Sequence, residues 1–408
     1  MIESWSWIND QGEMIGFFRP LTSATFMLEY PLFGLNPLAY RLVNLAMHLL
    51  CAFSIARLVM LLSGKKWFAV FAAALFSVYP GTVVATGMIV ARHDILACLF
   101  SVLALNSTVI LSRTPKTTWK AIMPALFVLF AVSSKELGMG NFIALPIMYF
   151  LWPGREKFKK NTLIFITSLV IVAVVYLAAR YMVFGNLGGY GAYTELVAVP
   201  AHVAILFLQV TGTFFVGLPI SRLLVYLSIV YVIANYARGE LQQWRKVGVA
   251  VLVTGAYSFQ SIVGDVAEHY VYTASAFTVL FLVYFAGRIE IPSRRGKQLL
   301  AGIALLAVLA AGYVTKRECC DFNNKYTNCE IVYTALENIS DSLPSESGAV
   351  CLVLSNSNTP IENEMKNVPL YMGLIDIDSQ CTFLIIRELN AGSDLPILVW
   401  EQDKIVIR

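Results

Sequence analysis

The charged and hydrogen-bonding side chains of this sequence gather in a few short clusters between long apolar runs. Two clusters pair a cation with a carboxylate, Arg92-His93-Asp94 and Lys135-Glu136. A cation at such a place can hold an anion, and the planar fork of Arg92 can bind a phosphate through two parallel hydrogen bonds. These clusters are therefore the first candidates for a polar site.

Both clusters also have a structural interpretation. Asp94 precedes the apolar run ILACLF, and aspartate is a preferred capping residue at a helix N-terminus. The Lys135-Glu136 pair can be an interfacial ion pair, which contributes little where it is exposed. Because charges are rare at membrane depth, the functional interpretation of Lys135 remains the stronger one.

A third cluster, Glu268-His269-Tyr270-Val271-Tyr272, precedes another apolar run. An anion contact made by His269 would depend on pH, since histidine changes its charge near neutrality. In the alternative, Tyr270 and Tyr272 belong to the aromatic belt at a membrane edge.

A polar stripe is expected on the helix that starts after Pro37. Arg41, Asn44 and His48 are spaced i, i+3 and i+7, so they share one helical face. Such a stripe faces a polar site or joins neighbouring helices. His48 lies about 10 Å below Arg41 on an ideal helix, which favours a structural role for His48.

Composition places these clusters in a membrane protein. The 408 residues are 58% hydrophobic and 14% charged, and apolar runs near ~20 residues recur along the chain. The net charge of +4 is small, and the basic residues lie in short loops, which excludes a nucleic-acid-binding surface. No CxxC pair indicates zinc, and the sequence shows no cofactor site and leaves a divalent metal undecided.

The apolar runs predict an α-helical polytopic membrane protein with about ten crossings. The expected crossings are Leu38–Leu62, Trp67–Tyr79, one from the Arg92 cluster to Ser112, Ala121–Val132, Leu137–Trp152, Leu163–Val183, Ile220–Ala237, Val247–Val263, Val271–Ala286 and Leu299–Val314. An additional segment, Pro200–Gly217, is expected to be embedded or re-entrant without a net crossing.

The basic loops predict the orientation of the chain. Lys65, Lys116, Lys159 and Arg294 are expected in the cytoplasm, which puts the Arg92, Lys135 and Glu268 clusters on the outer side. Residues 1–37 are expected to form an interfacial outer-loop segment, broken by Pro31, Gly34 and Pro37. Residues 38–315 form the transmembrane domain. Residues 316–408 form a small extracytoplasmic α/β domain, with strands Val350–Ser355, Cys381–Leu389, Ile397–Trp400 and Lys404–Ile407 and a helix Glu330–Asp341.

Several blocks resemble a known family when they are taken in order. They are Arg19-Pro20-Leu21 with LFGLNPLAYRLVNLAMH, then FAAALFSVYP…IVARHDILACLF, FAVSSKEL and EHYVYTASAF, which together span roughly Phe17 to Phe277. The blocks resemble bacterial relatives of the tetratricopeptide-bearing transmembrane O-mannosyltransferases, of the GT-C class. The tetratricopeptide pattern itself is not found here.

The resemblance implies a function. A mannose-like hexose would move, with inversion, from a polyprenyl-phosphate carrier to a protein or glycan acceptor at the outer face of the cytoplasmic membrane. The alternative is a polytopic flippase or transporter for lipid-linked sugars, or a catalytically inactive relative. A transporter would place paired ionisable groups at mid-bilayer on broken helices of both halves, and no such symmetric pair is found.

The resemblance also assigns residues. The donor phosphate would be held by Arg19, Arg92, Lys135 and His269. Supporting residues would be Asp94, Glu136, Glu268, Tyr270 and Tyr272. The third block departs from the family pattern, because His269 stands in place of an arginine and Ala274 in place of a proline.

The resemblance further places the catalytic acid in a first outer loop, after a preceding helix. Few residues precede Arg19 here, so we expect that the chain lacks that first helix and loop. Asp10 is the candidate base within the chain. In the alternative, Asp10 belongs to an amphipathic segment, Trp5–Ile15, which lies on the membrane with Asp10 and Glu13 on one helical face.

Overall fold

The computed structural model divides the chain into two compact units, Met1–Lys316 and Arg317–Arg408. The structure describes residues 6–8, 14–16, 18–34, 36–113, 118–152, 159–184, 241–258, 271–287, 298, 302, 305–306, 308–317, 319–320, 349–353, 382–386, 397–401 and 404–407.

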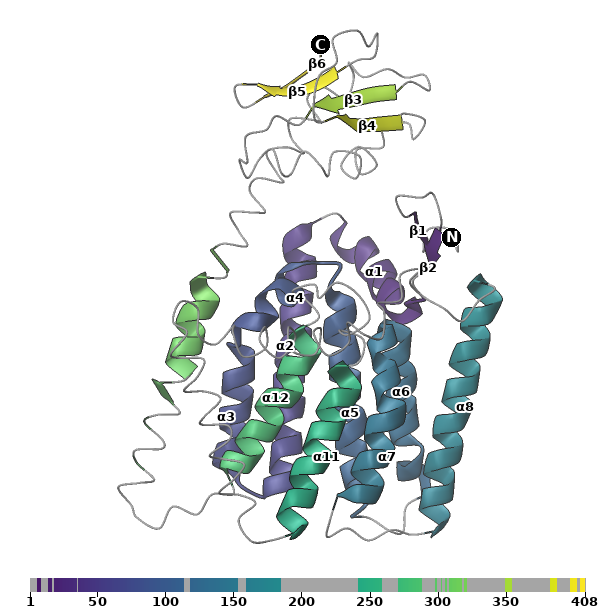
Figure 1. The fold of residues 1–408 in the computed structure, drawn as a ribbon, viewed down its shortest axis with the longest axis vertical. Helices are drawn as coiled ribbons and strands as arrows, with labels where there is room; N and C mark the ends of the chain where they lie inside the picture. The colour runs from purple at the N-terminus through teal and green to yellow at the C-terminus, as the bar shows by residue number, and fades with distance from the viewer. Residues whose placement is uncertain are drawn as a thin grey trace. The chain divides into compact units, whose positions relative to one another are not determined.

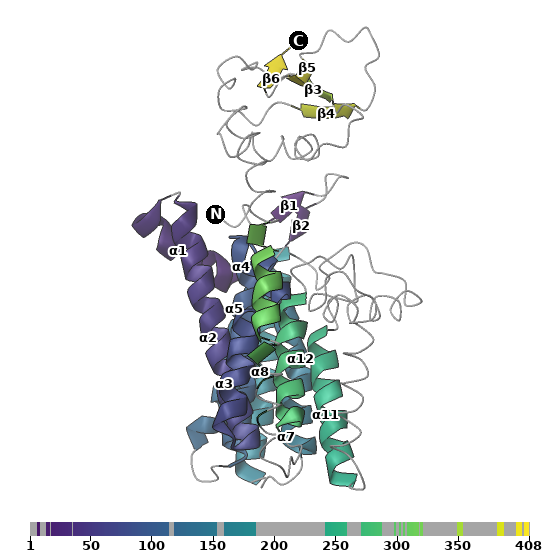
Figure 2. The ribbon, with the colours of Figure 1, turned by 90° about the vertical axis from the view of Figure 1, so that its left-hand side faces the viewer.

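The first unit is a bundle of helices. Figures 1 and 2 show α2, α3, α5, α6, α7, α8, α11 and α12 running roughly side by side. The α-helices are α1 (Pro20–Phe33), α2 (Pro37–Ser63), α3 (Lys66–Ser77), α4 (Val83–Gly87), α5 (Arg92–Leu111), α6 (Met123–Ser134), α7 (Asn141–Leu151), α8 (Lys159–Phe184), α11 (Leu241–Ser258) and α12 (Val271–Ala286). Short 3-10 helices are η2 (Pro80–Thr82), η3 (Thr118–Ala121) and η4 (Glu136–Gly140).

Local sequence signals set the bounds of α2, the longest of these helices. Asn36 caps its N-terminus, where the side chain accepts a hydrogen bond from the backbone N–H of Leu38 at 3.1 Å. Pro37 occupies the first turn, where its missing N–H costs nothing. Gly64 ends the helix with φ 72°, a conformation that favours glycine. The predicted crossing Leu38–Leu62 is thereby placed to within one residue at each end.

Two expectations for residues 1–37 are wrong. Pro31 lies inside α1 and does not break the run. The helix is held to distant segments by hydrogen bonds of Thr22 and Glu29. The amphipathic segment Trp5–Ile15 contains instead two short antiparallel strands, β1 (Ser6–Ile8) and β2 (Met14–Gly16).

The described residues make this an integral, multi-pass membrane protein. Three helices are long and apolar enough to cross a bilayer: Pro37–Ser63, Arg92–Leu111 and Lys160–Val183. A fourth candidate is the pair Lys66–Ser77 and Pro80–Gly87, which is bent by 58°. Shorter apolar helices add Trp119–Ser134, Glu136–Leu151 and Val271–Ala286. The total of about ten crossings stays a prediction, and Pro200–Gly217 lies outside the described residues.

Several predicted boundaries shift. The Arg92 cluster is the first turn of α5 and not a turn before it. The second expected crossing ends at Ser77, and the chain then bends at η2. α11 begins at Leu241, ahead of the predicted Val247, because polar residues such as Gln242 continue the helix beyond the apolar run.

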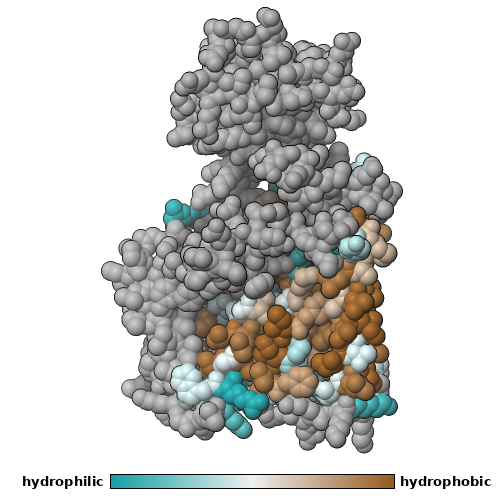
Figure 3. Space-filling view, turned by 45° about the vertical axis from the view of Figure 1, so that its right-hand side comes forward, coloured by the Kyte–Doolittle hydropathy of each residue, from teal (hydrophilic) through white to brown (hydrophobic). Residues whose placement is uncertain are grey.

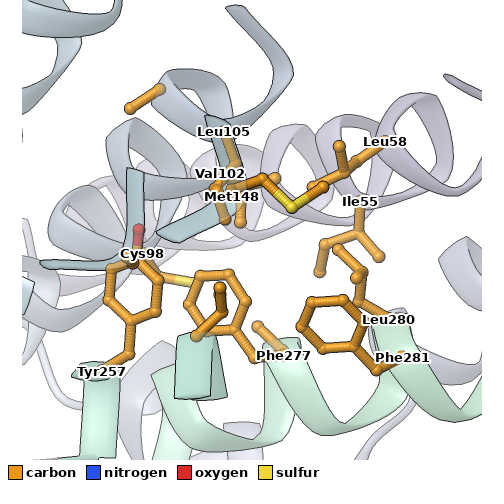
Figure 4. Close-up of a cluster of buried hydrophobic side chains, with 14 of the residues drawn as sticks. Ile55, Leu58, Cys98, Val102, Leu105, Met148, Tyr257, Phe277, Leu280 and Phe281 are labelled. Carbon is orange, nitrogen blue, oxygen red and sulfur yellow. The ribbon is translucent and has the colours of Figure 1, made fainter. Parts of the chain in front are cut away.

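Apolar side chains fill the space between the helices and also cover the outside of the bundle. Figure 4 shows the interior, where Ile55 and Leu58 of α2 and Val102 of α5 belong to one buried cluster with Phe277 of α12. The rings of Phe277 and Tyr257 stack with their centroids 4.0 Å apart. Cys51 and Cys98 are both fully buried.

Figure 3 shows a broad hydrophobic area on the outer face of the bundle. On α8, exposed apolar side chains recur along the helix: Leu163, Val170, Ile171, Val174 and Val175. In water this surface would be unfavourable, whereas in a bilayer it is the expected lipid contact.

The second unit contains a four-stranded sheet of order β4-β3-β5-β6. Its strands are β3 (Ala349–Val353), β4 (Thr382–Ile386), β5 (Ile397–Glu401) and β6 (Lys404–Ile407). β3 is parallel to β4 and β5, and β5 pairs with β6 in antiparallel register. The expected helix Glu330–Asp341 lies outside the described residues.

Candidate functional site

The predicted clusters 92–94 and 135–136 lie at one end of the helical bundle, here called the polar end. It comprises α1, the start of α5 and the chain after α6. The hydroxyl of Thr22 in α1 donates to the carbonyl oxygen of Ser134 at 3.1 Å, which joins α1 to the end of α6. α8 also ends there, since Arg180 contacts Glu136.

The opposite end of the bundle, here called the basic end, carries cations. Lys65 donates to the carbonyl oxygen of Gly287 at 2.5 Å, and Arg113 donates to the carbonyl oxygen of Leu61. Other described cations lie in elements that begin at this end: Lys66 of α3, Lys120 of η3, Lys160 of α8, and Arg245 and Lys246 of α11.

Arg92 is fully buried at the polar end. Its three guanidinium nitrogens all donate within the protein: Nε to Asn44 Oδ1 at 2.7 Å, Nη1 to Glu29 Oε1 at 2.5 Å and Thr25 Oγ1 at 3.2 Å, and Nη2 to the Tyr40 carbonyl oxygen at 3.1 Å. Arg92 therefore ties α1 to α2 and α5. Glu29, its ionic partner, was not identified from the sequence.

The polar stripe of α2 joins helices. Asn44 donates to the carbonyl oxygen of Met88 at 3.1 Å, in addition to accepting from Arg92. His48 lies between Tyr272 and Ser77, with Nδ1 2.8 Å from the Tyr272 hydroxyl and Nε2 3.3 Å from the Ser77 carbonyl oxygen. The structural role expected for His48 is confirmed. Tyr272 is fully buried, so it is not part of an aromatic belt.

Lys135 and Asp94 form a tight buried ion pair. Lys135 ends α6 in an extended conformation, and its Nζ donates to Asp94 Oδ1 at 2.6 Å. Asp94 Oδ2 lies 3.1 Å from His93 Nε2. Burial lowers the pKa of the Lys135 ammonium, and the negative charge of Asp94 opposes that shift. The capping interpretation of Asp94 is wrong in one respect, because Ala91 is the N-cap residue and Asp94 lies in the first turn of α5.

Glu136, the neighbour of Lys135, lies between two arginines. Its Oε2 is 3.4 Å from Arg19 Nη2, and its Oε1 is 3.4 Å from Arg180 Nη1. Arg180 was missed by sequence reasoning. A cation close to the end of the apolar run Leu163–Val183 is the signal that could have identified it.

Packing fixes both arginines. The ring of Phe18, next to Arg19, lies 5.7 Å from the ring of Tyr176, one helical turn before Arg180 on α8. A tight turn fixes Glu136, because a Cβ on Gly138 would lie 2.4 Å from the backbone carbonyl carbon of Ala131. Only a glycine allows η4 to fold back this closely on α6.

The polar end thus brings together Arg19, Arg92, Asp94, Lys135 and Glu136 of the predicted residues. Tyr272 lies deeper, against His48. The remaining candidates, Asp10, Glu268, His269 and Tyr270, lie outside the described residues. Within the described part of the first unit the carboxylates are Glu29, Asp94 and Glu136, and each is in an ion pair. Among the described residues no group of three His, Cys, Asp or Glu side chains could hold a metal ion.

Comparisons with known proteins identify distant relatives of this chain. No family model matches the chain. A stretch of 149 residues is 30% identical to protein O-mannosyl-transferase Tmtc1 of Drosophila melanogaster, and it covers 36% of this chain and 17% of that protein. A stretch of 88 residues is 34% identical to protein O-mannosyl-transferase TMTC2 of Mus musculus, and it covers 22% of this chain and 10% of that protein. The matched stretches thus span less than a fifth of these relatives.

One solved structure extends the likeness to nearly the whole chain. The apo structure of ArnT from Cupriavidus metallidurans aligns with a TM-score of 0.52 over 95% of this chain and 79% of that chain, at 12% identity. The chain has a GT-C membrane fold. The predicted resemblance to GT-C membrane glycosyltransferases is confirmed, with the O-mannosyltransferases as distant relatives. Two of the clusters that carried the resemblance, 92–94 and 135–136, meet at the polar end.

Proposed function

We propose that this protein is a membrane glycosyltransferase that moves a hexose, mannose-like, from a polyprenyl-phosphate carrier to a protein or glycan acceptor. The observation that carries the proposal is the group of three cations, Arg19, Lys135 and Arg180, at one end of an otherwise apolar bundle. The Drosophila and mouse relatives are glycosyltransferases by name, and the fold is that of a GT-C enzyme.

The charge of this group suits an anionic ligand. The three cations carry three positive charges, and the carboxylates of Asp94 and Glu136 carry two negative charges. With His93 neutral, the net charge of the group is +1. These side chains are between 1% and 16% exposed, so water screens them weakly. During transfer the phosphate oxygen that leaves the sugar gains negative charge, and cations already fixed in place stabilise that charge.

The residues divide by role in this proposal. Arg19 and Lys135 hold the donor phosphate. Asp94 orients Lys135, and Glu136 orients Arg19 before the phosphate binds. Arg92, expected from the resemblance to bind phosphate, is assigned instead to holding α1 in place, because its donors are all engaged within the protein.

The sequence-based assignments outside the described residues remain part of the proposal. Asp10 is the candidate catalytic base, and His269, with Glu268 and Tyr270, adds a further phosphate contact. A metal ion is not assigned to any of these residues.

The orientation follows from the distribution of basic residues. Lys65, Lys66, Arg113 and Lys120 lie at the basic end, which the positive-inside rule places in the cytoplasm. The polar end then faces the outer side of the cytoplasmic membrane, where the carrier and acceptor meet. The second unit is extracytoplasmic in this proposal.

The alternative is a flippase for lipid-linked sugars or an inactive relative. The observation that favours it is the ion pairing of all three described carboxylates of the first unit, since a general base needs a carboxylate that can take a proton.

The discriminating experiment reconstitutes the protein in vesicles with synthetic polyprenyl-phosphate mannose and polyprenyl-phosphate glucose. A transferase cleaves the sugar–phosphate bond and releases polyprenyl phosphate. Translocation of an intact lipid-linked sugar across the vesicle bilayer, without cleavage of that bond, would support the flippase instead.

A further inference from the structure

We propose that Glu136 is an internal stand-in for the donor phosphate. It occupies Arg19 and Arg180 while the site is empty, leaves them when the phosphate arrives, and returns to help expel the product. This inference rests on the proposed function. It adds Arg180 as a third phosphate-binding cation and gives Glu136 a role in exchange.

The geometry of the bridge is that of an anion site. Each oxygen of Glu136 takes one arginine, Oε2 with Arg19 and Oε1 with Arg180. The two arginines come from distant segments, the residue before α1 and the last turns of α8. A phosphodiester presents two non-bridging oxygens, and guanidinium groups recognise paired oxygens of this kind. The carboxylate therefore fills the place that such a phosphate would take.

The contacts of Glu136 with the two arginines are long enough for a phosphate to replace the carboxylate. Both Glu136 contacts are 3.4 Å long, whereas charge-assisted hydrogen bonds are usually about 2.7–2.9 Å. By contrast, Lys135 holds Asp94 at 2.6 Å. The loose pair can thus open while the tight pair stays closed, although Lys135 and Glu136 are neighbours in the chain.

The exposure of the side chains sets the order in which an incoming anion meets them. The side chains of Glu136 and Arg19 are 13% and 16% exposed, whereas that of Arg180 is 2% exposed. An anion arriving from solvent meets Arg19 and Glu136 first. It reaches Arg180 only after Glu136 has moved.

Charge explains why a returning carboxylate is useful. The donor is a phosphodiester with one negative charge, so replacing Glu136 by the donor leaves the charge of the site unchanged. The product is a phosphate monoester, whose second ionisation, with a pKa near 6, adds negative charge at neutral pH. Two arginines would retain that product strongly, and Glu136 competes with it for both.

The competition between Glu136 and the phosphate can be tested by equilibrium binding of a fluorescent polyprenyl phosphate to the purified protein in nanodiscs. Glu136→Gln keeps the shape and removes the competing charge, so binding should tighten roughly two- to ten-fold. Arg180→Gln should weaken binding about ten- to a hundred-fold, since one charge-assisted contact is lost. Lys160→Gln is the matched control, because it removes a cation from the exposed far end of the same helix and should leave binding unchanged.

A second variant at the same position keeps the test decisive if Glu136→Gln fails to fold. Glu136→Asp keeps the charge but shortens the side chain, so it cannot span both arginines, and binding should again tighten. If both Glu136 variants bind polyprenyl phosphate no more tightly than the parent protein, the inference is overturned. The same holds if Arg180→Gln binds as the parent does.

Sugar transfer, measured in parallel, separates this inference from the proposed function. Tightened binding without any transfer by the parent protein would retain the inference and reject the transferase. Sugar transfer by the parent protein, with no tighter binding of polyprenyl phosphate in the Glu136 variants, would retain the transferase and reject the inference.

Discussion

The guanidinium of Arg92 and the carboxylate of Glu29, 63 residues apart in the sequence, meet at 2.5 Å inside the polar end. Glu29 belongs to α1 and Arg92 begins α5, so this pair fixes α1 onto the bundle. The other end of α1 is fixed at Arg19 and Thr22, which contact Glu136 and the Ser134 carbonyl. α1 thereby connects the two clusters that the sequence singled out.

Breaking the Arg92–Glu29 pair should destabilise the protein. Arg92→Gln leaves a buried carboxylate without its partner, which costs about 3–5 kcal/mol. Glu29→Gln should act in the same direction, and the double variant should cost less than the sum of the two single variants because they share one contact. Thermal unfolding in detergent measures this, with Lys66→Gln as a control at the basic end. Independent, additive losses would show that the two residues do not interact.

The turn after Lys135 should not tolerate a methyl group. Gly138→Ala places a Cβ 2.4 Å from the backbone of α6, so the Lys135-Glu136 segment must shift. The variant should lose at least about 1–3 kcal/mol of stability, the usual cost of overpacking. The matched control is Gly248→Ala in α11, where a Cβ meets nothing within 4 Å and a helix gains by the exchange. Equal unfolding temperatures for the two variants would argue against the described turn.

The contact of Tyr272 with His48 should be measurable as a hydrogen bond. Tyr272→Phe removes the hydroxyl and leaves His48 Nδ1 without that partner, which costs about 1–3 kcal/mol. Tyr313→Phe, at a tyrosine that is 74% exposed, should be neutral. Thermal unfolding of the two variants checks this, and a neutral Tyr272→Phe would exclude a structural role for the contact.

Membrane orientation can be tested with an impermeant thiol reagent on intact cells. In a background without the native cysteines, Val90→Cys, exposed beside the start of α5, should be labelled. Lys66→Cys at the basic end should react only after the cells are opened, because we place that end in the cytoplasm. The reverse pattern would invert the proposed topology and remove the site from the outer face.

The sequence predicted the helices best where local signals agree. α2 lies between Asn36-Pro37 and Gly64, because cap, proline and glycine signals act over a few residues. α12 coincides with the predicted Val271–Ala286. α1 was missed because Pro31 is locally typical of a helix break, whereas Thr22 and Glu29 hold the helix through contacts with distant segments.

The polar site was predicted only in part, for the same reason. The sequence showed that Arg92, Lys135 and Glu136 are unusual in an apolar chain, but not which partners they have. Glu29 lies 63 residues from Arg92, and Arg180 lies 44 residues from Glu136. The pairing is therefore visible only in the folded chain, where the first pair joins helices and the second lies in the candidate site.

The central claim is that the cations of the polar end hold a sugar-donor phosphate. The most direct measurement is release of polyprenyl phosphate from polyprenyl-phosphate mannose, with kcat/KM compared between the parent protein, Lys135→Gln and Lys66→Gln. We predict turnover by the parent protein, a loss of about ten- to a hundred-fold per folded molecule in Lys135→Gln, and no loss in Lys66→Gln. Equal kcat/KM for folded Lys135→Gln and the parent protein, or no cleavage of any polyprenyl-phosphate sugar by the parent protein, would contradict the account.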